Sequence, residues 1–270
     1  MAYLELPPSP ELARDIELLW CLAGHASPHD FERVLPQGVA DIVINLGDGE
    51  VRCYDRERPI LVHRLGPIIS GVQRSYFVVD TRQLTSMVGV HFKPGGAWRF
   101  LGIPASEFSD EHVPLDAIPA LRDTAWLDRL ASAPTPVARL QLLDSLLRSG
   151  RRRESHPAIE WAVGQLRRYP DSARIAPLAT EAGLSMRRFN ELFTREVGVS
   201  PKGFARIRRF HSVLGRIAHT RPIDWSALAL EAGYSDQAHL IRDFREFSGL
   251  TPAAYRAQGA PAQPGHVYGA

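Results

Sequence analysis

The chain has 270 residues but only two cysteines, Cys21 and Cys53. This number excludes a disulfide framework, and the wide separation of the two residues excludes the CxxC pattern of zinc and redox sites. Neither cysteine has an adjacent cationic motif that would lower the pKa of its thiol, which argues against a reactive thiolate. Such low cysteine usage is typical of a reducing compartment, so we expect a cytoplasmic protein.

Long apolar runs are also missing. No segment approaches the roughly 18 apolar residues that a membrane-spanning helix needs. The opening sequence MAYLELPPSPELARD has neither the basic segment nor the apolar core of a secretory signal. We therefore expect no membrane partner.

Motifs for metals, phosphates and catalysis are absent as well. The close HxH pair and spaced glutamate of metal-binding cupins do not occur among His25, His29, His63 and His91. The glycine-rich KPGG at 93–96 lacks the Lys-Ser/Thr ending of a phosphate loop, and a turn before a helix explains it. We expect no metal, no cofactor and no enzymatic activity.

The net charge of +2 conceals an uneven distribution. Residues 151–256 contain 18 Lys and Arg against 11 Asp and Glu, which leaves the rest of the chain acidic. All but one of these basic residues are arginines, which suit bidentate contacts to phosphates and guanine edges. A solvated helical surface would have the same composition. The polar run SGRRRESHP (149–157) interrupts the apolar periodicity, so we place a domain boundary between residues 150 and 151.

The most informative feature is a repeat. Residues 174–201 read RIAPLATEAGLSMRRFNELFTREVGVSP, and residues 224–252 read DWSALALEAGYSDQAHLIRDFREFSGLTP. Each copy divides into a short helix, a tight turn and a second helix, with small alanines that allow close helix contact. Gly183 and Gly233 supply the positive φ that the turn needs. These are the requirements of a helix-turn-helix, whose second helix enters the major groove of DNA.

The polar and apolar positions of the two second helices serve different purposes. In the first copy we expect Ser185 to cap the helix, and Phe189, Leu192 and Phe193 to face the core. In the second copy the buried candidates are Leu240, Phe244 and Phe247. The apolar letters recur because both scaffolds pack alike, and the polar letters vary because each helix meets different bases. The predicted DNA-binding residues are Arg187, Arg188, Asn190, Glu191, Thr194, Gln237, His239 and Arg242.

One helix joins the two copies. The segment PKGFARIRRFHSVLGRIAHT (201–220) has apolar residues at helical spacing and begins at Pro201. At 1.5 Å per residue such a helix spans about 25–30 Å. This length suits two successive major grooves on one face of a duplex, which lie about 34 Å apart.

These motifs resemble the AraC/XylS family of bacterial transcription regulators. The likeness covers about residues 155–256 and rests on AGLSxxxFxxLFxxxxGVSP and AGYSDQAHLIRDFREFSGLTPAAYR. It implies a seven-helix unit that binds double-stranded promoter DNA and a contact with RNA polymerase. It also implies base-facing positions for Arg187, Asn190, Glu191, Gln237, His239 and Arg242.

Two of these positions have alternative roles. Many family members carry arginine where this chain has Glu191, which can accept a hydrogen bond from cytosine or pair internally with Arg187 or Arg195. His239 either contacts DNA or packs against its own domain.

The N-terminal half has a different pattern. Four segments, VADIVINL, PIISGV, YFVVDT and TSMVGVHF, are short, rich in Val and Ile, and bounded by Gly, Pro or Asp, as strands are. We expect a β-barrel or sandwich, cupin-like, with flanking helices near GAWRFLGIP, AIPALRDTAWLDRLA and TPVARLQLLDSLLRSG. This half resembles an uncharacterised N-terminal domain of a subgroup of such regulators. The resemblance implies a sensor for a small-molecule effector or a homodimer interface.

The expected protein is therefore α+β, with a β-rich sensing or dimerisation domain (1–150), an all-α DNA-binding domain (151–256) and a flexible tail (257–270). We interpret it as a sequence-specific transcription regulator that answers a signal at its N-terminal domain. One alternative is a fusion of a regulator with a DNA-repair alkyl acceptor, in which Cys21 or Cys53 is the acceptor. The other is a nonspecific architectural DNA binder that uses only its charge.

Overall fold

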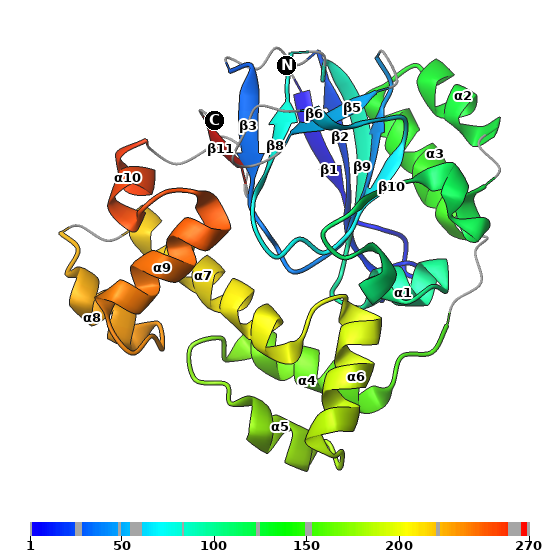
Figure 1. Ribbon diagram of the computed structural model, residues 1–270. Helices are drawn as coiled ribbons and strands as arrows, with labels where there is room; N and C mark the ends of the chain where they lie inside the picture. Colours follow the sequence, from blue (N-terminus) through cyan, green and yellow to red (C-terminus); the bar gives the residue numbers. More distant parts are fainter. Residues whose placement is uncertain are drawn as a thin grey trace.

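The computed structural model describes residues 2–24, 29–47, 50–54, 61–82, 84–122, 125–148, 153–219, 222–258 and 266–268. Among the described residues, the N-terminal part is built on two β-sheets and residues 157–257 form helices, and a short strand near the end of the chain joins the second sheet (Figure 1). The predicted fold class is thus confirmed. In the described part of the chain, no helix is long and apolar enough to cross a membrane.

The N-terminal strands form two antiparallel sheets that face each other. The first sheet has six strands, in the order β1 (Ala2–Leu6), β2 (Ile16–Ala23), β9 (Ser86–Phe92), β4 (Asp41–Asn45), β7 (Ile68–Ser70) and β10 (His112–Pro114). The second has five, in the order β11 (His266–Tyr268), β3 (Phe31–Val34), β8 (Phe77–Asp80), β5 (Val51–Tyr54) and β6 (Leu61–Leu65). Of the two expected architectures, the described strands form the sandwich, without a closed barrel.

The strands rich in Val and Ile were predictable, whereas the shorter ones were not. The four predicted segments contain β4, β7, β8 and β9. The segment from Ser9 to Trp20 forms a turn and then most of β2. The short strands β1, β3, β5, β6 and β10 lack a strong apolar pattern and owe their pairing to their neighbours. Strand β11 pairs with β3 in a segment for which the sequence predicted a flexible tail.

Helices cover the outer face of the first sheet. They are α1 (Gly96–Leu101), α2 (Ala125–Ser132) and α3 (Pro136–Arg148), with 3-10 turns η1 (Ala105–Phe108), η2 (Leu115–Ala117) and η3 (Pro119–Leu121). The backbone N–H of Ala138 donates to Thr135 Oγ1 at 3.1 Å, so Thr135 caps α3. Leu140, Leu143 and Leu147 are buried in the main core, so this leucine face covers its own domain.

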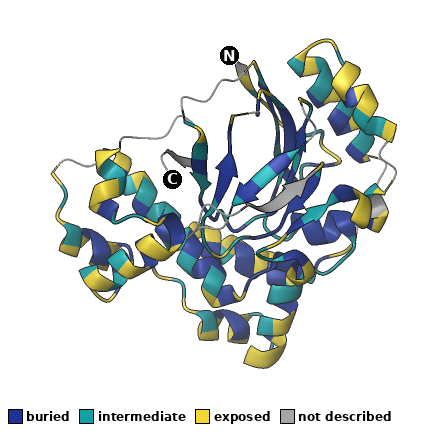
Figure 2. Ribbon diagram, turned by 45° about the horizontal axis from the view of Figure 1, so that its top comes forward, coloured by how far each residue is buried: buried dark blue, intermediate teal, exposed yellow. Residues whose placement is uncertain are grey.

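The described residues between 157 and 257 form seven helices. They are α4 (Pro157–Arg168), α5 (Ile175–Glu181), α6 (Met186–Val197), α7 (Pro201–His219), α8 (Trp225–Glu231), α9 (Gln237–Ser248) and α10 (Pro252–Ala257). The core of the first repeat, around α4, α5 and α6, is continuous with the core of the sandwich. The second repeat packs around α7 in a separate cluster, which also contains Leu35 from the N-terminal part. Figure 2 shows buried residues running through both parts.

Ion pairs reinforce the contact between the two parts. The guanidinium of Arg99 is buried, pairs with the buried carboxylate of Asp15, and reaches Glu160 of α4 at 2.5 Å. Glu160 also accepts from Arg14 at 2.8 Å. These contacts place α4 against the sandwich, although residues 149–152, where we predicted the domain boundary, lie outside the described chain. The packing unit therefore extends across the predicted boundary.

Candidate nucleic-acid interface

The first helix-turn-helix is formed by α5 and α6. Gly183 has a φ of +69°, and its turn is closed by a hydrogen bond from the Leu184 N–H to the Ala179 carbonyl at 3.0 Å. Ser185 Oγ accepts from the backbone N–H of Arg188 at 3.3 Å, so it caps α6 as predicted. The predicted core residues Phe189, Leu192 and Phe193 are all buried.

The polar residues of α6 lie on its other face. Arg187, Arg188 and Glu191 are exposed, and Asn190 and Thr194 are partly buried. Glu191 Oε2 accepts from Arg188 Nη1 at 3.1 Å, one helical turn away. The internal partner of Glu191 is therefore Arg188, whereas the sequence pointed to Arg187 or Arg195. This pair is exposed, so DNA phosphates can compete for Arg188.

The second helix-turn-helix is formed by α8 and α9. Gly233 has a φ of +75°, and a Cβ there would lie 2.0 Å from the Asp171 carbonyl oxygen, so the turn needs glycine for space as well as for conformation. Asp236 caps α9, because its Oδ1 accepts from the His239 N–H at 2.7 Å. The predicted core residues Leu240, Phe244 and Phe247 are buried as expected.

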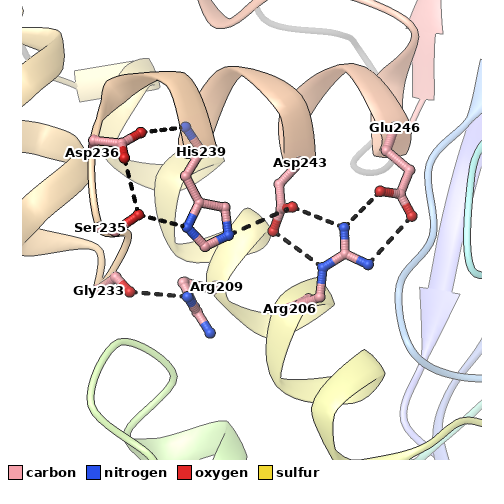
Figure 3. Close-up of polar contacts among 8 residues, drawn as sticks. All are labelled: Arg206, Arg209, Gly233, Ser235, Asp236, His239, Asp243 and Glu246. Carbon is pink, nitrogen blue, oxygen red and sulfur yellow. Dashed lines mark hydrogen bonds and ion pairs between the residues drawn. The ribbon is translucent and has the colours of Figure 1, made fainter.

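The ring of His239 is held by contacts within its own domain (Figure 3). Its Nδ1 lies 3.2 Å from Ser235 Oγ, its Nε2 lies 3.9 Å from Asp243 Oδ1, and its ring meets the Tyr234 ring edge-on at 5.1 Å. These contacts give His239 a packing role in the free protein. A contact between His239 and DNA stays a prediction.

The other predicted readers of α9 are more accessible. Gln237 Oε1 accepts from Ser226 Oγ at 3.1 Å, an exposed bond that a base could replace. Arg242 is exposed on α9. The His239 N–H is the main cause of a lowered pKa at Asp236, and the charge of Arg242 adds to it, so a positive charge lies beside the cap of the helix.

Several arginines of the basic domain have a structural role that the sequence did not reveal. Arg206 of α7 binds Asp243 at 2.8 Å and Glu246 at 2.6 Å, both on α9 (Figure 3). Arg209 donates to the Gly233 carbonyl at 2.9 Å and stacks on the Tyr234 ring. Arg216 pairs with Asp171. Part of the arginine excess therefore fixes α7 to the second helix-turn-helix. No local pattern in the sequence predicted this role, because the partner carboxylates lie far away in the chain.

The C-terminal ends of α6 and α9 both contact the N-terminal domain. Gly198 ends α6, and a Cβ there would lie 3.0 Å from Val72; Ser109 Oγ also donates to the Gly198 carbonyl. Gly249 ends α9, and a Cβ there would lie 2.9 Å from the Tyr76 ring. These two glycines occupy matching positions of the repeat. We call residues 71–76, which reach both of them, the bridging loop.

The N-terminal ends of the two helices are directed elsewhere. In Figure 1 the turn between α5 and α6 lies at the bottom of the molecule, away from the sandwich. The exposed residues Arg187 and Arg188 come from this end of α6. Each second helix therefore has one anchored end and one end with solvent-exposed polar residues, an arrangement that fits entry into a major groove.

Comparison with known families agrees with this geometry. Residues 178–258 match a family model described as a helix-turn-helix domain. The C-terminal part of this chain is therefore a helix-turn-helix domain. Residues 4–114 match a domain of unknown function (DUF6597), and no curated protein matches the chain.

Several solved structures are similar to this chain. A probable AraC family transcriptional regulator from Rhodopseudomonas palustris is 28% identical over 37% of this chain and 98% of its own, with a TM-score of 0.32. The DNA-binding domain of AdpA, a global transcriptional factor in complex with a target DNA, is 25% identical over 38% of this chain and 92% of its own, with a TM-score of 0.35. ToxT from Vibrio cholerae is 10% identical over 95% of this chain and 98% of its own, with a TM-score of 0.47.

Both cysteines are enclosed by the N-terminal domain. Cys21 and Cys53 are buried, and burial raises the pKa of Cys53 to about 12 and also raises that of Cys21. A thiol with a raised pKa contains little thiolate near neutral pH, and the thiolate is the nucleophile. The burial of both thiols gives no support to the alkyl-acceptor alternative.

We expect neither thiol to react in the native protein. After incubation with iodoacetamide near neutral pH, or with alkylated duplex DNA, the intact mass should be unchanged by mass spectrometry. The same protein unfolded in guanidinium should take up two carbamidomethyl groups from iodoacetamide. Transfer of an alkyl group from DNA to the native chain would restore the alkyl-acceptor hypothesis.

Proposed function

We propose that this chain is an AraC-type transcription regulator. It binds double-stranded promoter DNA of a specific sequence through α6 and α9, and a small molecule in the N-terminal domain changes this binding. The observation that carries the first part is the pair of helices with exposed N-terminal polar residues and anchored C-terminal ends. The 19 residues of α7 correspond to a length of about 28 Å at 1.5 Å per residue. This length supports contact with two successive major grooves on one face of the duplex.

Each predicted residue then has a proposed role. Arg242 and Gln237 read a guanine and an adenine by bidentate hydrogen bonds, and Asn190 reads an adenine in the other groove. Arg187 reads a guanine or binds a phosphate. Four predicted residues remain, Arg188, Glu191, Thr194 and His239. They fix the position of the protein on the duplex or read a base at closer approach.

The response to a signal is supported by a cavity in the sandwich. It has a volume of about 240 Å³, and its lining includes Gly71 and Gln73 of the bridging loop and residues 35–37. The same segments contact the DNA-binding domain. Leu35 is part of the core of the second repeat, and the Pro36 carbonyl accepts from His211 Nε2 of α7 at 2.8 Å. A molecule that moves the cavity wall would therefore change the relative positions of α6 and α9.

The remaining elements of the proposal follow from the resemblance. We expect a cytoplasmic protein in which the regulator contacts RNA polymerase once it is bound at a promoter. The N-terminal domain is the expected site of a homodimer contact.

Selection of bound sequences from a random duplex pool with the whole protein tests the function directly. We expect a motif with two half-sites about one helical turn apart. An architectural binder would enrich no motif and would bind promoter and random duplexes equally at every salt concentration.

Replacing Arg242 with alanine should weaken binding to the selected sequence by about 1–3 kcal/mol and relax specificity at one position. The readout is fluorescence anisotropy with the selected duplex and with a random duplex. Arg168→Ala, which removes an exposed arginine of α4, is the matched control and should leave both affinities nearly unchanged. If Arg242→Ala weakened both duplexes equally, Arg242 would be a phosphate contact.

A further inference from the structure

The second helices of the two repeats, α6 and α9, correspond residue by residue. Both have 12 residues, and each begins after a side-chain cap, Ser185 in α6 and Asp236 in α9. Each ends at a glycine with a positive φ, Gly198 and Gly249. Asp236 follows Ser185 by 51 positions, and Gly249 follows Gly198 by the same 51 positions. Each residue of α6 therefore has one counterpart in α9.

At two of these matching positions an amide in one helix stands where the other has an apolar side chain. Met186, the first residue of α6, matches Gln237, the first residue of α9. Asn190 of α6 matches Ile241 of α9. Within each helix the two positions are four residues apart, so they share one face. Both helices thus place one amide and one apolar side chain on this face, in opposite order.

The core does not use either apolar residue. Met186 is 41% exposed, and Ile241 is partly exposed. Among the described residues, neither belongs to a core cluster or to the apolar side chains packed against one. Phe189 and Leu240, another matching pair, are by contrast fully buried. Conservation of the core therefore explains the second pair and leaves Met186 and Ile241 without a packing role.

Exposure alone would identify no site, since single exposed apolar residues are common on protein surfaces. Met186 and Ile241 differ from such residues because their counterparts, Gln237 and Asn190, are both proposed readers of adenine. Helical side chains tilt toward the N-terminus, which directs Met186 toward the end of α6 that enters the groove. Ile241 lies one turn after Gln237 and directly before Arg242, another proposed reader.

The major groove offers one kind of apolar group, the C5-methyl of thymine. The other base edges present hydrogen-bond donors and acceptors there, and the flanking phosphates are charged. An apolar side chain that faces the bases gains free energy by covering a methyl group. It loses free energy when it separates a polar base edge from water without replacing the hydrogen bond. An apolar residue at a base-facing position therefore selects thymine.

We propose that Met186 and Ile241 are specificity-determining residues, each of which contacts the methyl group of a thymine in its own half-site. This inference rests on the proposed function, since it names bases within the sequence that α6 and α9 read. Each half-site then contains an adenine and a thymine, which are read by an amide and an apolar side chain one helical turn apart.

Uracil in place of thymine tests the contact, because this change removes the methyl group alone. Each thymine of the selected duplex is replaced in turn, and the affinity of the full chain is measured by fluorescence anisotropy. We expect one replacement in each half-site to weaken binding about fourfold, the factor that corresponds to burial of one methyl group. The other replacements should have smaller effects.

Two alanine variants assign the two thymines. Met186→Ala should bind the thymine and uracil duplexes equally at one of the two positions and keep the preference for thymine at the other. Ile241→Ala should do the reverse. Each variant is compared with itself on two duplexes, so a general loss of stability cannot imitate this result. Leu230→Ala, which removes an exposed leucine of α8, is the matched control and should keep both preferences.

A third variant tests the correspondence between the helices. Met186→Gln gives α6 the side chain that α9 has at Gln237. Selection from a random duplex pool with this variant should enrich adenine at the position where the native chain enriches thymine. Met186→Leu keeps an apolar side chain and should keep the thymine.

The proposal is wrong if no uracil replacement weakens binding by the native chain, or if both alanine variants keep both preferences. A preference that survives in one alanine variant overturns the role of that residue. A chain that enriches a DNA motif and binds every uracil duplex as tightly as the thymine duplex would overturn the methyl contacts alone. A chain that enriches no motif would overturn the proposed function and the methyl contacts with it.

Discussion

Replacing Arg206 with alanine should lower the free energy of unfolding by about 3 kcal/mol, the lower end of the range for breaking a buried ion pair, because the guanidinium is partly exposed. Asp243, whose side chain is only 6% exposed, would keep its charge and lose the contacts that compensate it. The Arg206 guanidinium also stacks on the Phe247 ring at 5.1 Å, so packing is lost as well. Urea denaturation measures the change.

The control is another arginine of the same region. Arg245→Ala removes an exposed arginine of α9 and should change stability by less than about 0.5 kcal/mol. The double variant Arg206→Ala with Asp243→Ala removes the uncompensated charge, so it should lose less than the sum of the two single variants. A loss for Arg206→Ala no larger than that for Arg245→Ala would show that the pair does not position α9.

Stability should also fall by about 3 kcal/mol as the pH drops from 6.5 to 4, because His211 titrates in this range. Burial lowers the pKa of His211 to about 4, with smaller contributions from Arg208 and His91, while the hydrogen bond to Pro36 opposes the shift. The unfolded chain has the ordinary pKa of 6.5. Between these values the unfolded state binds the extra proton, so stability rises with pH across this window and is complete above it.

His211→Gln tests the assignment, since glutamine can donate to the Pro36 carbonyl but does not titrate. The variant should lose the slope between pH 6.5 and 4 in urea denaturation. His91 does not confuse the result, because its raised pKa gives a contribution that is lost only above its unfolded pKa of 6.5. A slope of unchanged size in the variant would assign the acid sensitivity to other groups.

Local sequence predicted the helical half well because its evidence is periodic. Apolar residues at spacings of three and four, with Ser185 as a cap and Gly183 and Gly233 at the turns, define the two helix-turn-helix units without any tertiary information. The matching positions in the two copies strengthened each assignment. Fewer than half of the described strands were recovered, because short strands such as β5 and β10 have too few residues to show alternation.

The polar partners were less predictable. The sequence left Glu191 open between a contact to cytosine and an internal pair with Arg187 or Arg195. In the structure its partner is Arg188, the neighbour one turn away. It left His239 undecided between DNA and packing, and the structure provides packing contacts from Ser235, Tyr234 and Asp243. Such contacts depend on rotamers and on residues brought together by folding, and a linear pattern records neither.

The sequence by itself determined that this chain has two helix-turn-helix units on a connecting helix, and which faces of them are apolar, because these properties follow from the spacing of residues within single helices. Only the tertiary structure decided where these units sit relative to the N-terminal domain. The contacts of Val72 with Gly198 and of Tyr76 with Gly249 join residues more than 100 positions apart. The cavity of the sandwich likewise combines strands that are distant in the chain, and burial in a shared core brings them together.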